Sequence, residues 1–295
     1  MRVLKIISIE SSKLKLNITP EYGGKIINFT YDDFNIFRPI PLDKINLEEA
    51  YKGGSFALVP FSNRLKNAEF YFEDIFYKIN TNAFPHSIHG HGNYVSWDVI
   101  KKTKSSTVIK YEHNSNELGW PWPYQAQQSF SLKDSELTIK LTVINKSSIN
   151  MPFGFGIHPF FNFDDEIKLK FKAEREWIGL PENFPTKTKL VENNFNINNG
   201  KKLWKTEKTI CYENFEGEVQ IFWVNKNKEI KIKADRVFNH LIVHVPNGGK
   251  YFCIEPVSHP TDSFNLAHKK IENIKNQFLK PNESFTGSIT IAVEQ

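Results

Sequence analysis

The amino-acid sequence predicts an all-β protein, built as one large antiparallel β-sandwich. Apolar and polar residues alternate with a period of two at 137–143 and again at 285–293, which is typical of strands with one buried face. Short polar turns at 73–74, 133–135 and 225–228 separate neighbouring strand segments, as expected of antiparallel hairpins. The 25 phenylalanines also suit the packing of strands better than that of helices.

We expect further strands wherever a short apolar or alternating stretch ends in a turn. In chain order these are residues 3–9, 13–18, 24–30, 69–72, 75–79, 97–102, 107–112, 124–131, 153–157, 167–171, 218–224, 229–234, 240–245 and 250–254. Helical signals are weak, and only 45–51 and 262–272 could form two or three turns. Residues 186–209 are rich in Asn, Lys and Thr without clear periodicity, so we expect a long excursion there. Strands of the same character resume after it and no fixed repeat is visible, so we predict a single domain over residues 1–295.

Composition and charge exclude several classes of protein. The formal net charge is +5, but the 38 basic residues, of which only five are arginines, are scattered among acidic ones. This pattern is typical of a solvated surface, so we expect no nucleic-acid partner. No stretch approaches the ~18 apolar residues of a membrane span, and residues 1–16 lack the apolar core of a signal peptide. The two cysteines, Cys211 and Cys253, have no partner spacing, so we expect a reducing compartment and a cytoplasmic protein.

Polar and aromatic residues concentrate in four segments, at 53–65, 84–97, 151–163 and 252–265. In the first, Asn63 and Arg64 end an apolar run abruptly. An arginine in this position can fork onto a carboxylate or onto sugar hydroxyls, or it can pair with a structural acid at a strand end.

The second segment carries three closely spaced histidines, His86, His89 and His91. Three imidazoles allow a metal site, but zinc prefers about four ligands, and no cysteine or carboxylate motif accompanies them. His86 and His91 can equally be residues of a surface loop. We therefore expect no metal, and we expect His89, which lies between Ile88 and Gly90, to point into a cleft.

The third and fourth segments each offer a group for proton transfer. His158 lies among phenylalanines and close to two glycines, where it is either a proton donor and acceptor or a core histidine bonded to the backbone. Glu255 follows the apolar stretch 251–254, and a carboxylate there is costly to bury unless it is paired or functional. Burial would raise its pKa and make it a better base, whereas at a solvated strand end it would have no such role.

The remaining motifs concern aromatic residues and cofactors. Trp97, Trp120 and Trp122 can stack on sugar faces or pack in the core, and we include Trp122 among the candidate sugar-binding residues. The glycines form no phosphate-binding loop and no nucleophile elbow, so we expect no nucleotide cofactor.

Taken in order, these segments resemble the aldose 1-epimerase (galactose mutarotase) family. The resemblance rests on PFSNR at 60–64, IHGHGN at 88–93, Trp97, GIHPFF at 156–161, CIEPVSHPTDSFN at 253–265 and LKPNES at 279–284, and it spans about residues 20–293. It implies a large galactose mutarotase-like β-sandwich (a supersandwich) with a cleft for a free hexose. It also implies interconversion of α and β anomers with no cofactor and no metal.

The resemblance also implies roles for particular residues. His158 would protonate the ring oxygen, and Glu255 would remove the proton of the anomeric hydroxyl. Asn63, Arg64 and His89 would bind the sugar. Asp262 would either reach the sugar or brace its loop.

One departure bears on the identity of the sugar. The resemblance implies a substrate-binding aspartate in the turn that corresponds to 225–228, where this chain has Asn-Lys-Asn-Lys. We expect a free aldohexose as the small-molecule partner, because arginine, the usual phosphate ligand, is scarce around the motifs. The alternatives are a hexose 6-phosphate mutarotase and a non-catalytic carbohydrate-binding protein. We expect a monomer or a weak homodimer.

Overall fold

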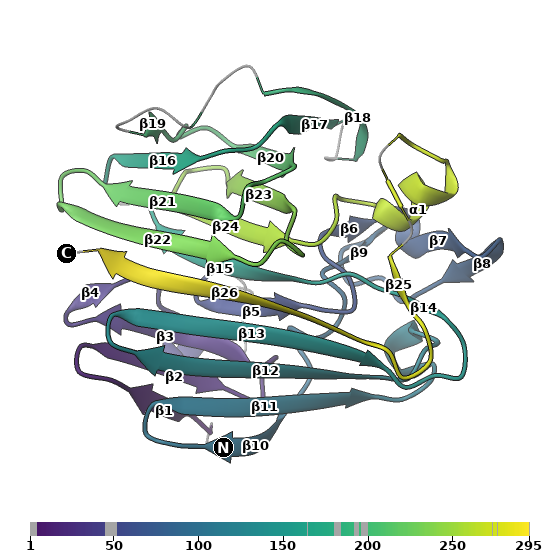
Figure 1. Cartoon of the computed structure of the whole chain (residues 1–295), viewed down its shortest axis with the longest axis horizontal. Coiled ribbons are helices and arrows are strands. Elements are labelled where there is room, and N and C mark those ends of the chain that lie inside the picture. The colour runs from purple at the N-terminus through teal and green to yellow at the C-terminus, as the bar shows by residue number, and fades with distance from the viewer. Residues whose placement is uncertain are drawn as a thin grey trace.

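The protein consists of two large antiparallel β-sheets that pack face to face, as seen in a computed structural model (Figure 1). The structure describes residues 5–44, 52–163, 165–179, 184–191, 195, 200–272, 274, 275 and 277–294. The all-β class and the antiparallel pairing expected from the sequence are confirmed. The expected helix at 45–51 and the first two residues of the expected strand 3–9 lie outside the described residues.

The first sheet has eleven strands within the described residues and carries the functional site described below. Its order is β1 (Ile7–Glu10), β2 (Leu14–Thr19), β3 (Lys25–Tyr31), β5 (Ser55–Leu58), β15 (Gly156–Asn162), β24 (Tyr251–Val257), β23 (His240–Val245), β20 (Lys208–Glu213), β17 (Arg175–Gly179) and β18 (Pro185–Leu190), with β4 (Phe34–Asn35) paired to β3.

The second sheet has nine strands in the same described part of the chain and forms the front layer of Figure 1. Its order is β10 (Asp98–Lys102), β11 (Ser106–His113), β12 (Tyr124–Lys133), β13 (Glu136–Asn145), β26 (Ser284–Glu294), β22 (Lys228–Ala234), β21 (Glu218–Trp223), β16 (Ile167–Phe171) and β19 (Lys201–Lys202).

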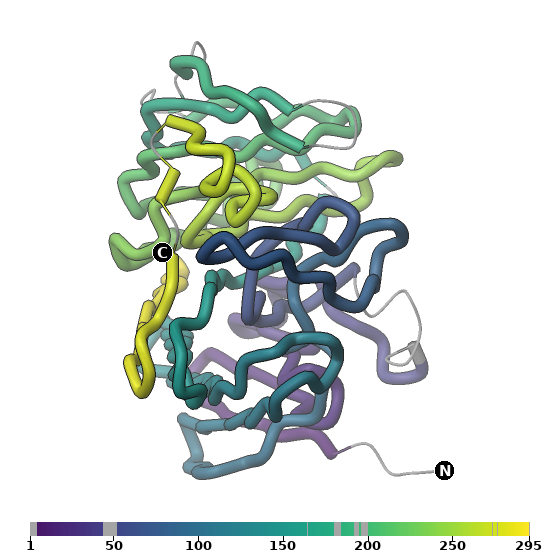
Figure 2. Tube along the Cα trace, turned by 90° about the vertical axis from the view of Figure 1, so that its right-hand side faces the viewer, coloured from purple at the N-terminus to yellow at the C-terminus, as the bar shows by residue number. Residues whose placement is uncertain are grey.

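Smaller elements gather at one end of the sandwich, on the right of Figure 1. They are the pairs β6 (Arg64–Leu65) with β9 (Ser87–Ile88), β7 (Glu69–Phe72) with β8 (Ile75–Lys78) and β14 (Met151–Pro152) with β25 (Phe278–Leu279), together with α1 (Ser263–His268). Short 3₁₀ turns lie at Leu42–Lys44, Lys66–Ala68 and Glu117–Gly119. Figure 2 shows the blue segment that follows β5 lying across the middle of this end. None of the described helices is long and apolar enough to cross a membrane.

The alternation of residues along each strand creates the core between the sheets. In β24, Phe252 and Ile254 belong to this large core, whereas Cys253 and Val257 belong to a second cluster on the opposite face of the same sheet. Because successive side chains of a strand point to opposite faces, Glu255 shares the second face with Cys253. The eleven-stranded sheet therefore presents one face to the core and the other to the functional site.

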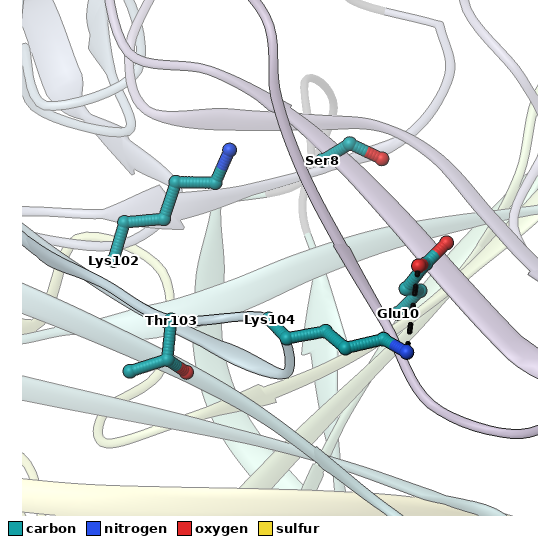
Figure 3. A pocket seen from close by; sticks show the side chains of 5 residues that line it. All are labelled: Ser8, Glu10, Lys102, Thr103 and Lys104. Atoms are coloured by element: carbon teal, nitrogen blue, oxygen red, sulfur yellow. Dashed lines mark ion pairs between the residues drawn. The ribbon is translucent and has the colours of Figure 1, made fainter.

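The two sheets approach each other along one edge, where β1 lies near β10 and β11. The Glu10 N–H donates a hydrogen bond to Lys104 O at 2.9 Å, and Lys104 Nζ lies 4.0 Å from Glu10 Oε1 (Figure 3). Ser8, Lys102 and Thr103 complete a pocket at this edge. It is open to solvent and its ion pair joins two exposed side chains, so we place the functional site elsewhere.

The expectations for residues 153–157 and 186–209 differ most from the structure. The expected strand 153–157 begins only at Gly156, because the Gly154 N–H donates to Pro60 O instead of joining the ladder. The expected excursion 186–209 contains most of β18, all of β19 and the start of β20. Half of β18 is exposed at the sheet edge and only Pro185 is buried, so its sequence needs no apolar alternation, and this explains the missing periodicity.

Candidate active site

His158 and Glu255 come together on neighbouring strands of the eleven-stranded sheet. β15 and β24 pair Gly156 with Val257 and Phe160 with Cys253, and this register places His158 opposite Glu255. His158 Nε2 lies 3.3 Å from Glu255 Oε1. The two residues are only 6% and 2% exposed. The sequence alone could not establish this contact, because 97 positions separate the two residues along the chain.

Burial sets the proton affinities of this pair. It raises the pKa of Glu255 to about 8, against the opposing charge of Arg64. It also lowers the pKa of His158 well below its ordinary value, and the neighbouring His89 and His244 act in the same direction. His158 Nδ1 and Glu255 Oε2 are buried and have no hydrogen-bond partner among the described residues. Such atoms are costly to bury unless a ligand or water satisfies them, so they indicate a binding site.

His89 is held beside this pair by two hydrogen bonds to the backbone of Asn63. The His89 N–H donates to Asn63 O at 2.9 Å, and the Asn63 N–H donates to His89 Nδ1 at 3.1 Å. Because Nδ1 accepts, the neutral ring carries its proton on Nε2. Burial and the charge of Arg64 lower the pKa of His89 to about 3, which keeps the ring neutral. Its ring centroid lies 5.1 Å from that of His158, so His89 can offer an Nε2–H donor at the same place.

Arg64 is positioned by pairing of β6 with β9 and by Asp262. The register of the pair sets Arg64 opposite Ile88, directly before His89. The Asp262 N–H donates to Arg64 O at 2.9 Å, and Asp262 Oδ1 accepts from the Lys66 N–H at 3.0 Å. Of the two roles left open for Asp262 by the sequence, these contacts favour bracing the loop that carries Arg64. Asn63 is tied to the same turn, since its Oδ1 accepts the Arg64 N–H at 2.8 Å.

A pocket of about 420 Å³ opens in front of His158. It is lined by Phe56, Asn82, Ile88, His89, Asn93, Tyr94 and His158. This volume lies within the usual range for small-molecule sites. Asn93 Oδ1 is buried in its wall and has no partner among the described residues, so it is a further polar atom available to a ligand. Asn63 instead lines a smaller cavity of about 30 Å³, together with Thr261 and Cys211.

Trp122 does not line the main pocket. It is 1% exposed and packs against Tyr77 and Trp120, with ring centroids 4.6 and 5.1 Å away. No face of its ring remains for stacking on a sugar, so its placement is that of a core residue.

The other two histidines of the 86–91 motif lie apart from His158. His86 Nδ1 accepts the Asn67 N–H at 3.0 Å, and His91 Nε2 is hydrogen-bonded to Tyr124 Oη at 2.7 Å. Of the three, His89 is the one that lines the pocket, as its sequence context suggested.

The turn at 225–228 belongs to the nine-stranded sheet, where it joins β21 to β22. Asp165 Oδ1 accepts the Asn225 N–H at 3.2 Å, and Asp165 Oδ2 accepts the Lys226 N–H at 3.0 Å. None of the four residues of this turn lines the pocket in front of His158.

Lys25 and His244 are two further polar neighbours of His158, and the sequence alone did not indicate either of them. Lys25 is 2% exposed, its Nζ lies 5.4 Å from the centre of the Phe56 ring, and burial lowers its pKa to about 8. His244 lies opposite Cys253 in the ladder of β23 and β24, and its Nδ1 is hydrogen-bonded to Thr209 Oγ1 at 2.8 Å. A lysine at the start of an apolar strand was the available signal for Lys25, but only the register of β3 with β5 brings it near His158.

The fold and the site together define a galactose mutarotase-like β-sandwich with a buried imidazole–carboxylate pair at a pocket. The sequence profile of the aldose 1-epimerase family matches residues 5–292, and the chain belongs to this family. Among curated proteins it is 26% identical to the uncharacterized protein YphB of Escherichia coli, over 99% of both chains.

Solved structures share the fold. One is a candidate aldose 1-epimerase from Escherichia coli, 24% identical, with a TM-score of 0.87 and 99% of both chains covered. Another is a galactose mutarotase-like protein from Clostridium acetobutylicum, 22% identical, with a TM-score of 0.86 and 99% and 96% covered. The GalM/aldose epimerase homologue of C. elegans is 16% identical, with a TM-score of 0.83 and 99% of both chains covered.

Proposed function

We propose that this protein is an aldose 1-epimerase that interconverts the α and β anomers of a free aldohexose. The contact between His158 and Glu255 carries the proposal, because ring opening requires one group that accepts a proton and one that donates a proton. Both groups are buried on the same face of the sheet, and His158 lines a pocket large enough for one sugar ring. Membership of the aldose 1-epimerase family supports a carbohydrate isomerase.

In the proposed reaction, Glu255 takes the proton of the anomeric hydroxyl and His158 gives a proton to the ring oxygen. The bond between C1 and the ring oxygen breaks, and the C1 oxygen becomes the carbonyl of an open-chain aldehyde. Rotation about the C1–C2 bond turns the other face of the carbonyl toward the ring oxygen. Reclosure returns each proton along the reverse path, so the cycle consumes nothing and the pair regains its starting state.

One proton shared by the pair is sufficient for this cycle. In the empty site, the raised pKa of Glu255 and the lowered pKa of His158 favour the proton on the carboxyl. The 3.3 Å contact allows its transfer to His158, which leaves a carboxylate base and an imidazolium acid. The charge of Arg64 favours the carboxylate form, which stabilises the state needed for ring opening.

We assign sugar binding to Arg64 and His89, with Asn63 and Asp262 holding the turn that carries Arg64. The neutral His89 ring offers an Nε2–H to a sugar hydroxyl, and the guanidinium of Arg64 offers a fork of N–H donors. We also propose that the active form is a monomer or a weak homodimer. We also propose a cytoplasmic location, because Cys211 and Cys253 are both free thiols.

Polarimetry of freshly dissolved α-glucose and α-galactose, with and without the protein, tests this function. We expect the protein to accelerate the drift of optical rotation to the same end point. Sugar binding without acceleration would identify a non-catalytic carbohydrate-binding protein instead. A higher kcat/KM for glucose 6-phosphate than for either free sugar would identify a hexose 6-phosphate mutarotase.

A further inference from the structure

A thiol lies next to the proposed acid–base pair and has no part in the proposed reaction. Cys253 precedes Glu255 by two positions in β24, so both side chains lie on the same face of the sheet. One ligand atom each from His158, Cys253 and Glu255 lies within 4.8 Å of the other two, and all three residues are buried. We propose that these three side chains form a binding site for a thiophilic divalent cation such as Zn²⁺, and that the bound cation inhibits the enzyme.

The distance between the imidazole and the carboxylate fits one edge of a tetrahedral site. Zinc binds imidazole nitrogen and carboxylate oxygen at roughly 2.0–2.2 Å, so two such ligands at a tetrahedral angle are about 3.3–3.5 Å apart. The 3.3 Å between His158 Nε2 and Glu255 Oε1 is therefore close to one edge of a zinc tetrahedron. Cys253 supplies the soft ligand that favours zinc or cadmium over magnesium or calcium.

The environment of the three ligands also favours an ion there. Glu255 Oε2 is buried without a hydrogen-bond partner among the described residues, so the carboxylate has unused acceptor capacity beside the thiol. Three protein ligands leave the fourth position of the cation for water or a sugar hydroxyl, and His158 opens this position toward the pocket.

Binding is an exchange of protons for a cation. The cation displaces the proton of the Cys253 thiol and the proton held by the His158–Glu255 pair, and both protons leave to solvent. No bond to the sugar forms or breaks in this step. Because the cation occupies both groups that the proposed mutarotase needs, it blocks the reaction; this consequence rests on the proposed function, whereas the binding itself does not.

Cys211 provides a matched control. It is also buried and free, and in the ladder it lies opposite Ile242, which in turn lies opposite Glu255. It therefore sits two strands away from Glu255, outside the group of three ligands. Comparison of Cys253→Ala with Cys211→Ala separates coordination at the proposed site from binding to any buried thiol.

The direct test is titration of the reduced, metal-free full-length protein with CdCl₂, followed by the ultraviolet charge-transfer absorption of the cadmium–thiolate bond. We expect the band in the wild type and in Cys211→Ala, its displacement by ZnCl₂, and its loss in Cys253→Ala. His158→Asn keeps the thiol and should weaken cadmium binding about tenfold or more. Circular dichroism identifies folded variants, and Cys253→Ser replaces Cys253→Ala if the alanine variant does not fold.

Activity provides the second readout. We expect ZnCl₂ to slow mutarotation by the wild type and by Cys211→Ala, and EDTA to restore the rate. The zinc concentration that gives the same inhibition should be about tenfold higher or more for Cys253→Ala. A cadmium band that persists without Cys253, that depends on Cys211, or that is absent from the folded wild type would overturn the inference. If mutarotation is absent but the band behaves as expected, the proposed function fails and the metal site stands.

Discussion

His158 in β15 and Glu255 in β24 face each other across an antiparallel ladder, with Nε2 and Oε1 3.3 Å apart. An antiparallel ladder fixes such a pair more rigidly than a loop could, because both backbones are held by neighbouring strands on either side. β15 lies between β5 and β24, and β24 lies between β15 and β23, so both residues are on interior strands. A proton can move between the two groups without rearrangement of the backbone.

Removal of either group should reduce kcat and leave KM nearly unchanged. Glu255→Gln keeps the size of the side chain but removes the base, and His158→Asn removes the proton donor. General acid or base catalysis contributes roughly 10²–10⁴-fold, so we expect each variant to lose about this factor in polarimetric assays. The double variant should be far less than multiplicatively worse, because the two groups act in one cycle.

Glu213→Gln is the control for this experiment, because Glu213 is another buried carboxylate of the same sheet that lies in β20. It should keep the wild-type kcat. If Glu255→Gln retains more than about a tenth of the wild-type kcat, Glu255 is not the general base.

The kcat/KM of the wild type should fall as the pH rises through about 8. The proposed active form holds one proton on the His158–Glu255 pair, and burial raises the pKa of Glu255 to about 8. Above that pH the pair loses the proton that His158 must give to the ring oxygen, so the rate decreases. The pH profile of kcat/KM reports the free enzyme and is the measurement to make. A kcat/KM that continues to increase well above pH 8 would show that ring opening needs only the carboxylate.

Sugar binding should depend on Arg64 and His89 more than on the acid–base pair. Arg64→Ala removes the guanidinium, and His89→Ala removes the ring whose Nδ1 accepts the Asn63 N–H. We expect a larger increase of KM from these changes than from Glu255→Gln, with some loss of kcat through misplacement of the sugar. Arg236→Ala, at an exposed arginine, is the control. An unchanged KM in Arg64→Ala would remove Arg64 from the sugar site.

The strands with one buried face were predictable, because their period is visible in the residues themselves. Residues 167–171 and 240–245 agree with β16 and β23 at both ends. Edge strand β18 was not predictable in this way, since only one of its six residues is buried and no side has to be apolar.

The residues of the candidate site differ in whether a local sequence motif indicates them. Local motifs indicated His89, His158 and Glu255 as candidates, whereas Lys25 and His244 come near them only through the register of strands that are distant in the chain. Trp122 shows the opposite error: an aromatic residue near polar motifs suggested sugar stacking, but the core of the sandwich covers it. Composition cannot show which aromatic residues remain open to a ligand.

Trp122 should therefore affect stability and not sugar binding. Its ring fills a buried aromatic cluster with Trp120, Tyr77 and Phe70. Trp122→Ala should lower the free energy of unfolding by roughly 3–5 kcal/mol, and Trp122→Phe should lower it by less because an aromatic ring remains. Urea unfolding and the KM of the folded variants measure the two effects. A raised KM in Trp122→Phe with unchanged stability would restore the stacking role.

Stability should also decrease in acid, and His240 should account for a measurable part of this decrease. His240 is buried in β23, its Nδ1 is hydrogen-bonded to Asn239 Oδ1 at 2.7 Å, and its Nε2 has no partner among the described residues. Burial, with a smaller effect of His259, lowers the pKa of His240 from 6.5 to about 3. Between these two values the unfolded chain binds a proton that the folded protein does not, so the free energy of unfolding falls as the pH decreases. For one histidine the decrease is at most about 2.7 kcal/mol between pH 6.5 and 4.5.

His240→Asn keeps an amide for Asn239 but removes this proton uptake. The difference in unfolding free energy between pH 7 and pH 4.5 should therefore be smaller in His240→Asn than in the wild type, as measured by urea unfolding. His268→Asn, at an exposed histidine, is the control and should retain the wild-type difference. An equal difference in His240→Asn and the wild type would show that His240 does not contribute to the acid sensitivity, which would then arise from the other buried histidines.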